Sequence, residues 1–416
     1  MRASNRIIDV LSSLVAVEAR SQRVLRLPGH VAFGAATLSL IFVFAVAGAP
    51  IPLYTTYQTQ DAISHADLGL VSVAYFVACT ISLLILGRTS NVLGRKPVSL
   101  AALASAAFSC VLLMRMHSVA TLFAARTLQG LACGVASSSL GAYVVDTAPD
   151  RPRWLPALIT GSAPMVGIPL GAVMCGALVT YAPSPRVLIF VILVTVLLAC
   201  TAAIALSPET SAARGSVLRS LRPRFQLPAA AKQIVVAAGA AFVATWSLGG
   251  YYQAYGPSLV AESLGTSNAL VGATVFSSVM ILNPFGGAAA SRWTPRRSLL
   301  VGMVAFIFAL IGIVMSVHAR AIVPFLGVSL LVGLAQGAAS TGAIRGLLAT
   351  AEEEERAGTL ATIYLISYAG AAIPAFIASK LARSFNLTQI ADGYALLGIT
   401  SALIACFAAR GRHNQS

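Results

Sequence analysis

The sequence predicts an all-α membrane protein with about twelve transmembrane helices in two pseudo-symmetric six-helix halves. Three observations support this: the hydropathy is high, long apolar segments recur at regular intervals, and landmarks of the first half repeat in the second. Of 416 residues, 57% are hydrophobic and only 10% are charged, with a mean hydropathy of +0.84. Soluble domains have about 25% charged residues. This chain therefore has too few charges to cover a water-exposed surface.

Twelve apolar segments are long enough to cross a hydrocarbon core about 30 Å thick, which takes roughly 20 helical residues. They span approximately residues 31–50, 68–87, 98–116, 119–143, 155–181, 187–206, 234–248, 269–290, 299–317, 322–347, 360–381 and 391–409. In lipid only helices and closed barrels satisfy the backbone, and barrel strands are alternating segments of about ten residues. These long apolar runs therefore predict helices.

Residues 1–29 form an N-terminal lead-in with an early basic residue and an apolar stretch, which also fits a cleaved signal peptide. However, Asp9 and Glu18 interrupt the apolar stretch, and a full span begins at residue 31. We therefore favour a short amphipathic cytoplasmic lead-in over a signal peptide.

Basic residues are distributed unequally between the two sides of the predicted membrane. With the N-terminus in the cytoplasm, inner segments hold 21 of the 28 Lys and Arg residues, outer segments hold 5 and spans hold 2. This bias predicts a multi-pass plasma-membrane protein (a bacterial inner membrane) with both termini in the cytoplasm. The net charge of +15 then reflects topology, and we expect the lipid bilayer but no nucleic acid as a partner.

The longest inner loop, residues 207–232, separates the two predicted halves. It is rich in basic residues and proline, which is typical of a solvated linker. The sequence therefore predicts a first half over residues 30–206, a second half over 233–410, and a cytoplasmic tail over 411–416.

The two halves share landmarks at a nearly constant spacing. Gln129 and Gly130 in the fourth span recur as Gln336 and Gly337 in the tenth, 207 residues later. Three further pairs repeat at similar spacing: Pro169 and Pro374, Pro50 and Pro257, and Gly87 and Gly287. The pattern predicts a parallel repeat of two six-helix halves.

A glycine-rich basic loop follows the second span. It contains Gly87, Asn91, Gly94, Arg95 and Lys96, and this spacing resembles the signature loop of the major facilitator superfamily. Asn91 stands where that family usually has an aspartate. The resemblance implies a gating loop whose polar residue bonds the start of the eleventh helix in the opposite half and holds the cytoplasmic side closed. A generic basic loop at the inner membrane surface is the alternative.

The second half contains a weaker copy of this loop. It runs from Gly287 through Ser291, in the position of the acid, to Arg292 and two further arginines. We include Arg292 in the predicted gating loops.

In the fourth span, Arg126, Gln129 and Gly130 resemble the second motif of the same family, Arg-x-x-Gln-Gly. An arginine inside a span costs about 2.5–3.5 kcal/mol on insertion scales and usually faces the protein interior. Gln129 follows three residues later on nearly the same helical face. We predict that Arg126, Gln129 and the repeat residue Gln336 line the substrate cavity; a structural clamp between helices is the alternative.

The fifth span contains Gly167, Pro169 and Gly171, a run that loosely resembles the antiporter motif of the superfamily. Ile168 and Ala172 depart from that motif, which weakens an inference of efflux. Small residues also permit tight helix packing, and an internal proline kinks a helix. We therefore assign these residues to a hinge or a packing face.

The seventh span ends in a cluster that includes Trp246, Tyr251 and Tyr252. Aromatic residues here fit either a belt at the membrane interface or the walls of a ligand pocket. The family resemblance implies that the first, fourth, seventh and tenth helices line a central cavity, so we include these three residues among the cavity candidates.

The sequence offers no reactive constellation for an enzyme. All acids and histidines lie in loops or at span edges, the six cysteines lie singly in spans without metal-like spacing, and there is no phosphate-binding loop for ATP. We expect no catalytic residue, no metal and no cofactor.

The resemblance implies a secondary transporter whose halves expose a central site alternately to each side. An acid-poor cavity with one arginine suits an amphiphilic or anionic small organic molecule. We favour efflux by a monomer, with an uptake permease for a small organic acid as the alternative. A channel is the remaining interpretation.

Overall fold

The computed structural model describes residues 27–211, 216–221, 232–352 and 355–410. It contains twelve helical segments that are long and apolar enough to cross a membrane, which confirms the predicted number. Residues 1–26 of the lead-in, most of the basic linker and the tail 411–416 lie outside the described residues.

Six of these segments form the N-terminal half, and two of them are built from consecutive helices. The elements are α2 (Gly29–Gly48), η1 (Ile51–Leu53), α3 (Tyr54–Asp61), α4 (His65–Ile81), η2 (Ser82–Leu86), α6 (Arg95–Met114), α7 (Val119–Thr147), α8 (Leu155–Tyr181) and α9 (Pro185–Leu206). A short helix, α5 (Ser90–Leu93), lies in the loop before α6.

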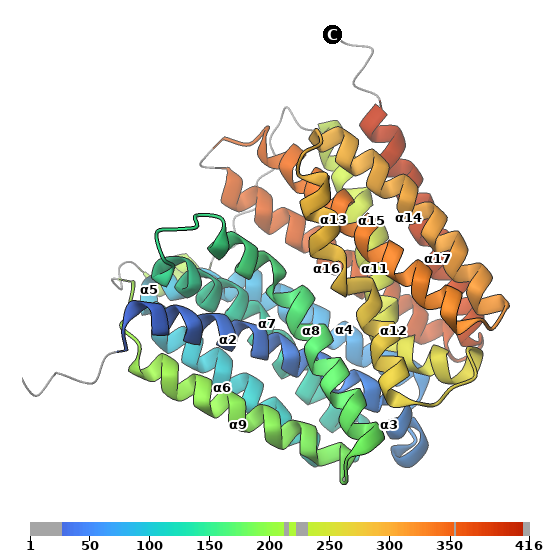
Figure 1. Ribbon diagram of the computed structural model, residues 1–416, viewed down its shortest axis with the longest axis horizontal. Helices are drawn as coiled ribbons and strands as arrows, with labels where there is room; N and C mark the ends of the chain where they lie inside the picture. Colours follow the sequence, from blue (N-terminus) through green and yellow to red (C-terminus); the bar gives the residue numbers. More distant parts are fainter. Residues whose placement is uncertain (1–26, 212–215, 222–231, 353–354, 411–416) are drawn as a thin grey trace, which may run out of the picture.

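The other six segments form the C-terminal half (Figure 1). They are α11 (Lys232–Ser263), α12 (Ala269–Ile281) with α13 (Asn283–Ala290), α14 (Pro295–His318), α15 (Ile322–Leu348), α16 (Arg356–Leu381) and α17 (Leu387–Arg410). A short helix, α10 (Val217–Ser220), lies in the linker.

Helix α11 extends well beyond the predicted seventh span, which ended at residue 248. It continues through Gly249, Gly250 and Pro257 to Ser263. The polar and aromatic residues that suggested an end instead pack inside the C-terminal half, where tertiary contacts outweigh the low helix propensity of glycine.

The repeated Gln-Gly pair marks the same helix contact in both halves. A Cβ atom on Gly130 would lie 2.3 Å from the carbonyl oxygen of Tyr75 on α4. A Cβ atom on Gly337 would lie 2.0 Å from the carbonyl oxygen of Asn283 on α13. In each half, therefore, a glycine lets the fourth segment approach the second at a distance that no other residue permits.

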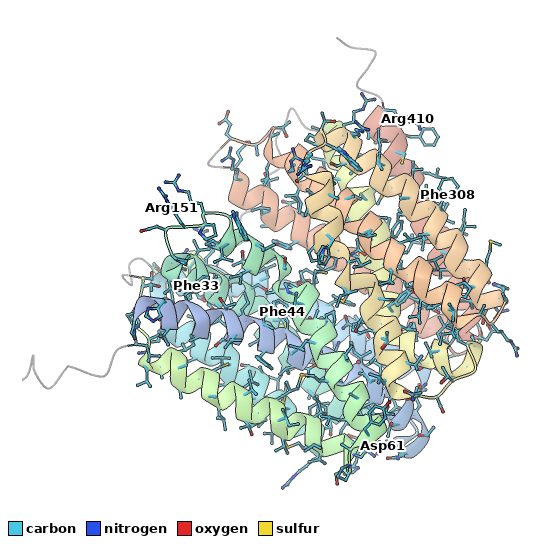
Figure 2. The ribbon with its side chains drawn as sticks, viewed as in Figure 1. Phe33, Phe44, Asp61, Arg151, Phe308 and Arg410 are labelled. Atoms are coloured by element: carbon cyan, nitrogen blue, oxygen red, sulfur yellow. The ribbon has the colours of Figure 1, made fainter. Side chains whose placement is uncertain are left out.

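The two halves meet mainly where α4 packs on α16 and α8 packs on α12. We call the end of the molecule where α2 begins and α17 ends the linker face, and the opposite end the far face. Figure 2 shows Arg151 and Arg410 at the linker face and Asp61 at the far face.

Candidate functional site

Arg126 lies in the interior of the N-terminal half, on α7, and its side chain is 0% exposed. Its Nη1 atom donates to the carbonyl oxygen of Ala47 at 2.6 Å and to Oε1 of Gln129 at 2.8 Å. Gln129 in turn donates through Nε2 to the carbonyl oxygen of Val46 at 3.0 Å. The pair thus binds the carbonyl end of α2 and joins the first and fourth segments.

One side of the Arg126 guanidinium has no hydrogen-bond acceptor in the described part of the chain. Its Nε and Nη2 atoms are buried and unpartnered, as is the hydroxyl of nearby Tyr54. The Tyr75 ring lies 4.5 Å from Cζ and supplies a cation–π contact. Because Nε and Nη2 together form the fork that holds a carboxylate side-on, the free side of Arg126 is suited to a bidentate anion.

Aromatic contacts continue from Arg126 to the interface between the halves. Tyr75 packs edge-on against Phe76 with ring centroids 5.4 Å apart, and Phe76 lies 6.4 Å from Tyr368 on α16. Tyr368 packs edge-on against Trp246 on α11 at 4.8 Å. Its hydroxyl also accepts a hydrogen bond from the Cys79 thiol at 3.0 Å. We call Phe76, Cys79, Trp246 and Tyr368 the central cluster.

Tyr364 lies one helical turn before Tyr368 on α16. Its side chain is 42% exposed, whereas Tyr368 contacts Cys79 of the opposite half. Because four residues make about one helical turn, Tyr364 lies on the same side of α16 as Tyr368, toward the N-terminal half. Neither α16 tyrosine was among the residues predicted from the sequence, although their spacing of four residues places them on one side of a helix.

The other predicted cavity residues lie elsewhere in this conformation. The rings of Tyr251 and Tyr252 are enclosed within the C-terminal half, where the Tyr252 hydroxyl is 2.7 Å from the Ser329 hydroxyl. Tyr251 packs against Tyr394 on α17. Gln336 is half-buried on α15. Trp246 is the aromatic candidate whose ring packs against Tyr368 of the central cluster.

The signature loop is held to its own half. Arg95 donates through Nε to Asp146 on α7 at 3.1 Å and through Nη1 to Asn91. The backbone of Gly94 has φ 99°, and the Arg95 and Lys96 amides donate to the Glu209 carboxylate at 2.8 and 3.0 Å. Among the described residues, Asn91 has no hydrogen bond to the start of α16; its side chain accepts from Arg95 instead.

In the second half, an arginine from the tenth segment holds the equivalent loop. Arg345 on α15 donates to the carbonyl oxygens of Ser291 and Trp293 at 2.9 and 3.0 Å. Arg292 is exposed beside them. In both halves, therefore, an arginine ties this loop to the fourth segment. In the N-terminal half the arginine belongs to the loop, whereas in the C-terminal half it belongs to the fourth segment.

The run from Gly167 to Gly171 on α8 packs against α2. A Cβ atom on Gly167 would lie 2.4 Å from the Ile41 carbonyl oxygen, and one on Gly171 would lie 1.8 Å from that of Ala45. Pro169 is buried between them. These contacts place the run directly behind the segment of α2 whose carbonyls bind Arg126 and Gln129.

Polar contacts between the described parts of the two halves lie at the centre and at the far face. At the far face, His65 on α4 lies 2.9 Å from Glu262 on α11, and its other ring nitrogen lies 2.9 Å from Gln58. Gln58 accepts from Ser258 at 2.7 Å. Thr180 lies 3.4 Å from Asn268. These contacts join the two halves at the far face.

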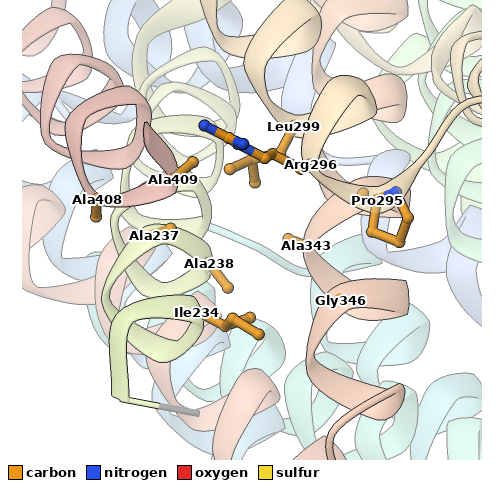
Figure 3. Close-up of a pocket in the computed structure, with 11 residues that line it drawn as sticks. Ile234, Ala237, Ala238, Pro295, Arg296, Leu299, Ala343, Gly346, Ala408 and Ala409 are labelled. Carbon is orange, nitrogen blue, oxygen red and sulfur yellow. The ribbon is translucent and has the colours of Figure 1, made fainter. Parts of the chain in front are cut away.

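A small cavity at the linker face lies within the C-terminal half rather than between the halves. Figure 3 shows it bordered by Ile234, Pro295, Leu299 and Ala409, with Arg296 at its edge. Its volume is about 80 Å³, whereas ligand sites usually measure about 300–1,000 Å³. It is too small for an organic substrate.

Within the described ranges, no group of three or more His, Cys, Asp or Glu side chains could hold a metal ion. What the geometry does provide is two six-helix bundles joined through a central cluster, with a buried arginine beside it. This arrangement defines a polytopic membrane transporter. A sequence profile described as the Major Facilitator Superfamily matches residues 34–373, and the chain belongs to that family.

The fold is similar to that of a solved transporter. A crystal structure of the nucleoside transporter NupG matches with a TM-score of 0.70 over 91% of this chain and 99% of that one, at 11% sequence identity. Among curated protein sequences, none matches this chain.

Proposed function

We propose that this secondary transporter exports a small organic molecule that carries a carboxylate, by alternating access across the plasma membrane. The observation that carries this proposal is the free Nε and Nη2 side of Arg126. A buried guanidinium without an acid partner is costly, because an unpaired buried charge loses its hydration. A bound carboxylate would compensate that cost in a bidentate pair.

The central cluster supports a substrate with an aromatic or other apolar part. Trp246 and Tyr368 present ring faces and edges from two helices of the C-terminal half, and Phe76 does so from the N-terminal half. Aromatic groups pack favourably against such rings, by about 0.5–1.5 kcal/mol per pair beyond area burial. A molecule that contacts Arg126 and this cluster would touch both halves and sense their movement.

Two observations favour export over uptake. The far-face contacts favour the linker face as the side from which substrate enters, and the distribution of basic residues supports a cytoplasmic position for that face. The run from Gly167 to Gly171 also resembles the antiporter motif. Uptake of an organic acid is the second candidate, because the free fork of Arg126 would serve it equally well.

A thermal-shift screen of the purified protein tests the substrate class. The panel pairs aromatic carboxylates with their neutral amides and includes nucleosides, because the structurally similar NupG is a nucleoside transporter. A ligand at 100 times its Kd stabilises a folded protein by about 2.7 kcal/mol. We expect carboxylates to raise the melting temperature and their amides not to. Stabilisation by amides and acids alike would contradict the proposal.

Direction is then tested with the identified substrate in cells that overproduce the transporter. Export predicts lower accumulation than in cells that carry an Arg126→Lys variant. Higher accumulation would instead establish the uptake alternative.

A further inference from the structure

A second, larger cavity lies on the side of the C-terminal half, away from the interface between the halves. It is a groove between α16 and α17 with α11 as its floor, and its volume is about 590 Å³. Its lining is almost entirely apolar, and it includes Ile373, Ile377 and Leu381 from α16 and Leu397 from α17. The volume falls within the range of about 300–1,000 Å³ that is typical of ligand sites.

The packing of three helices creates this groove. Helices α16 and α17 each pack closely along α11 but barely contact one another. Gly370 on α16 and Gly393 on α17 both line the groove. A Cβ atom on Gly393 would meet no other atom within 4 Å. The absence of a side chain at these glycines therefore leaves the groove open, and a larger residue there would fill it.

The groove faces outward from the bundle. Ile373 and Ile377 are 59% and 52% exposed although they lie within a span. Because both are apolar and lie in the membrane-crossing part of α16, acyl chains are the surroundings that they require.

Basic side chains lie at the far-face end of the groove. Lys380 lies three residues after Ile377 and seven after Ile373, and so shares their side of α16. Its Nζ atom lies 5.3 Å from the Phe376 ring centroid. Arg383 follows in the turn between two lining residues, Leu381 and Phe385. Both basic residues are exposed, and long basic side chains at a helix end reach the headgroup region.

We propose that this groove is a binding site for one anionic phospholipid. An acyl chain would lie between α16 and α17 over Gly393, and the phosphate would be held by Lys380 and Arg383. The combination of an apolar groove within the bilayer and two cations at its end matches the two parts of such a lipid. This site lies apart from Arg126 and the central cluster, so it stands independently of the proposed transport function.

Native mass spectrometry of the full-length protein in mild detergent tests the site. The probes are phosphatidylglycerol and phosphatidylcholine, added in equal amounts. We expect one phospholipid to remain bound to the wild-type chain, with phosphatidylglycerol preferred. Gly393→Phe should lower occupancy at least tenfold by filling the groove. Gly327→Phe is the matched control, because Gly327 is another helical glycine with no atom near its Cβ position, and it should retain the lipid.

A charge variant tests the headgroup part of the proposal. Lys380→Gln with Arg383→Gln should remove the preference for phosphatidylglycerol, whereas Arg320→Gln, at an exposed arginine on the same face, should not. Wild-type occupancy in Gly393→Phe would overturn the acyl-chain site, and an unchanged headgroup preference in the charge variant would overturn the cation site. Gly393→Leu provides the same test if the phenylalanine variant does not fold. Retention of a small apolar compound instead of a phospholipid would also contradict the proposal.

Discussion

At the scale of single residues, the unpartnered Nε and Nη2 atoms of Arg126 distinguish a substrate-binding role of this side chain from a purely structural one. The Nη1 atom already bonds α2, so part of the side chain clamps helices in the way that the structural interpretation of this arginine requires. The Nε and Nη2 atoms do not contribute to that clamp. The two interpretations therefore concern different atoms of one side chain and can be tested separately.

We predict that Arg126→Lys folds and inserts into the membrane but loses substrate affinity by about 10–100-fold, whereas Arg126→Ala abolishes transport. Lysine keeps the charge but lacks the planar fork, and a hydrogen bond to a charged group is worth about 1.5–3 kcal/mol. The measurement is substrate exchange in proteoliposomes, with melting temperature as the folding control. Wild-type transport by Arg126→Ala would show that this arginine is only a clamp.

Arg126 could be predicted from the sequence because an arginine within a span is rare. Tyr364 and Tyr368 could not, because a tyrosine in an apolar span looks the same whether it faces lipid or the protein interior. Trp246, Tyr251 and Tyr252 were grouped because they lie close together on one helix. The helix packing separates them: Trp246 packs against Tyr368, whereas Tyr251 and Tyr252 are enclosed within the C-terminal half.

At the scale of elements, the far face and the linker face are held by different kinds of contact. His65 and Glu262 link α4 to α11 across the two halves. At the linker face, Arg95 and Arg345 link each loop to its own half. The far-face contacts must therefore break when the protein opens to that side, whereas the loops can move with their halves.

We predict that Glu262→Gln makes opening of the far face easier. A surface contact to a carboxylate contributes about 0.2–1 kcal/mol, so the population that is open to the far side should rise by up to about five-fold. The measurement is the rate at which an impermeant maleimide added from the far side labels an engineered cysteine at Tyr364→Cys. All six native cysteines are buried, so background labelling should be low. Asp392→Asn is the matched control, because that carboxylate pairs with His318 within one half. An equal effect of both variants would contradict the assignment.

We predict that Asn91→Asp favours closure of the linker face. A charge at a helix N-terminus is worth about 0.3–1 kcal/mol, so maleimide labelling of Tyr364→Cys from the linker side should slow by several-fold at most. Arg95 already lies beside Asn91 and will share the new carboxylate, which limits the effect. Unchanged or faster labelling would count against a gating role for this loop.

The element boundaries show where sequence and structure diverge. The repeat of Gln129 and Gly130 as Gln336 and Gly337 predicted two similar halves, and the same close helix contact occurs at both glycines. The end of α11 was placed 15 residues too early because Gly249, Gly250 and Pro257 are poor helix formers in isolation. Packing of Tyr251, Tyr252 and Tyr255 within the half outweighs that preference.

At the scale of the whole molecule, twelve spans and two halves could be predicted because lipid leaves the backbone few alternatives. The conformation could not, since alternating access requires that one sequence stabilise two arrangements of its halves. In the proposed function, substrate identity depends on side chains from α4, α7, α11 and α16, which are far apart in the sequence.

We predict that transport does not require proton movement through the protein. The acids of the described chain lie at helix ends or in loops: Asp67 caps α4 through Ser64, and Asp146 binds Arg95. Arg126 does not deprotonate in a working range. Proteoliposomes that contain a pH dye and a substrate without a titratable group provide the test. Stoichiometric proton flux under those conditions would contradict the prediction and implicate Asp67 or Asp146.

The most direct test of alternating access is to lock the far face and measure exchange. Thr180 and Asn268 face each other across the two halves with side-chain oxygens 3.4 Å apart. In a Thr180→Cys, Asn268→Cys variant, a short bis-methanethiosulfonate reagent should join α8 to α12 through two reducible disulfides, with a sulfinate leaving from each end of the reagent. The account predicts that cross-linking abolishes substrate exchange in proteoliposomes, that substrate still binds from the linker face, and that reduction restores exchange. Exchange at the wild-type rate with the cross-link in place would contradict it.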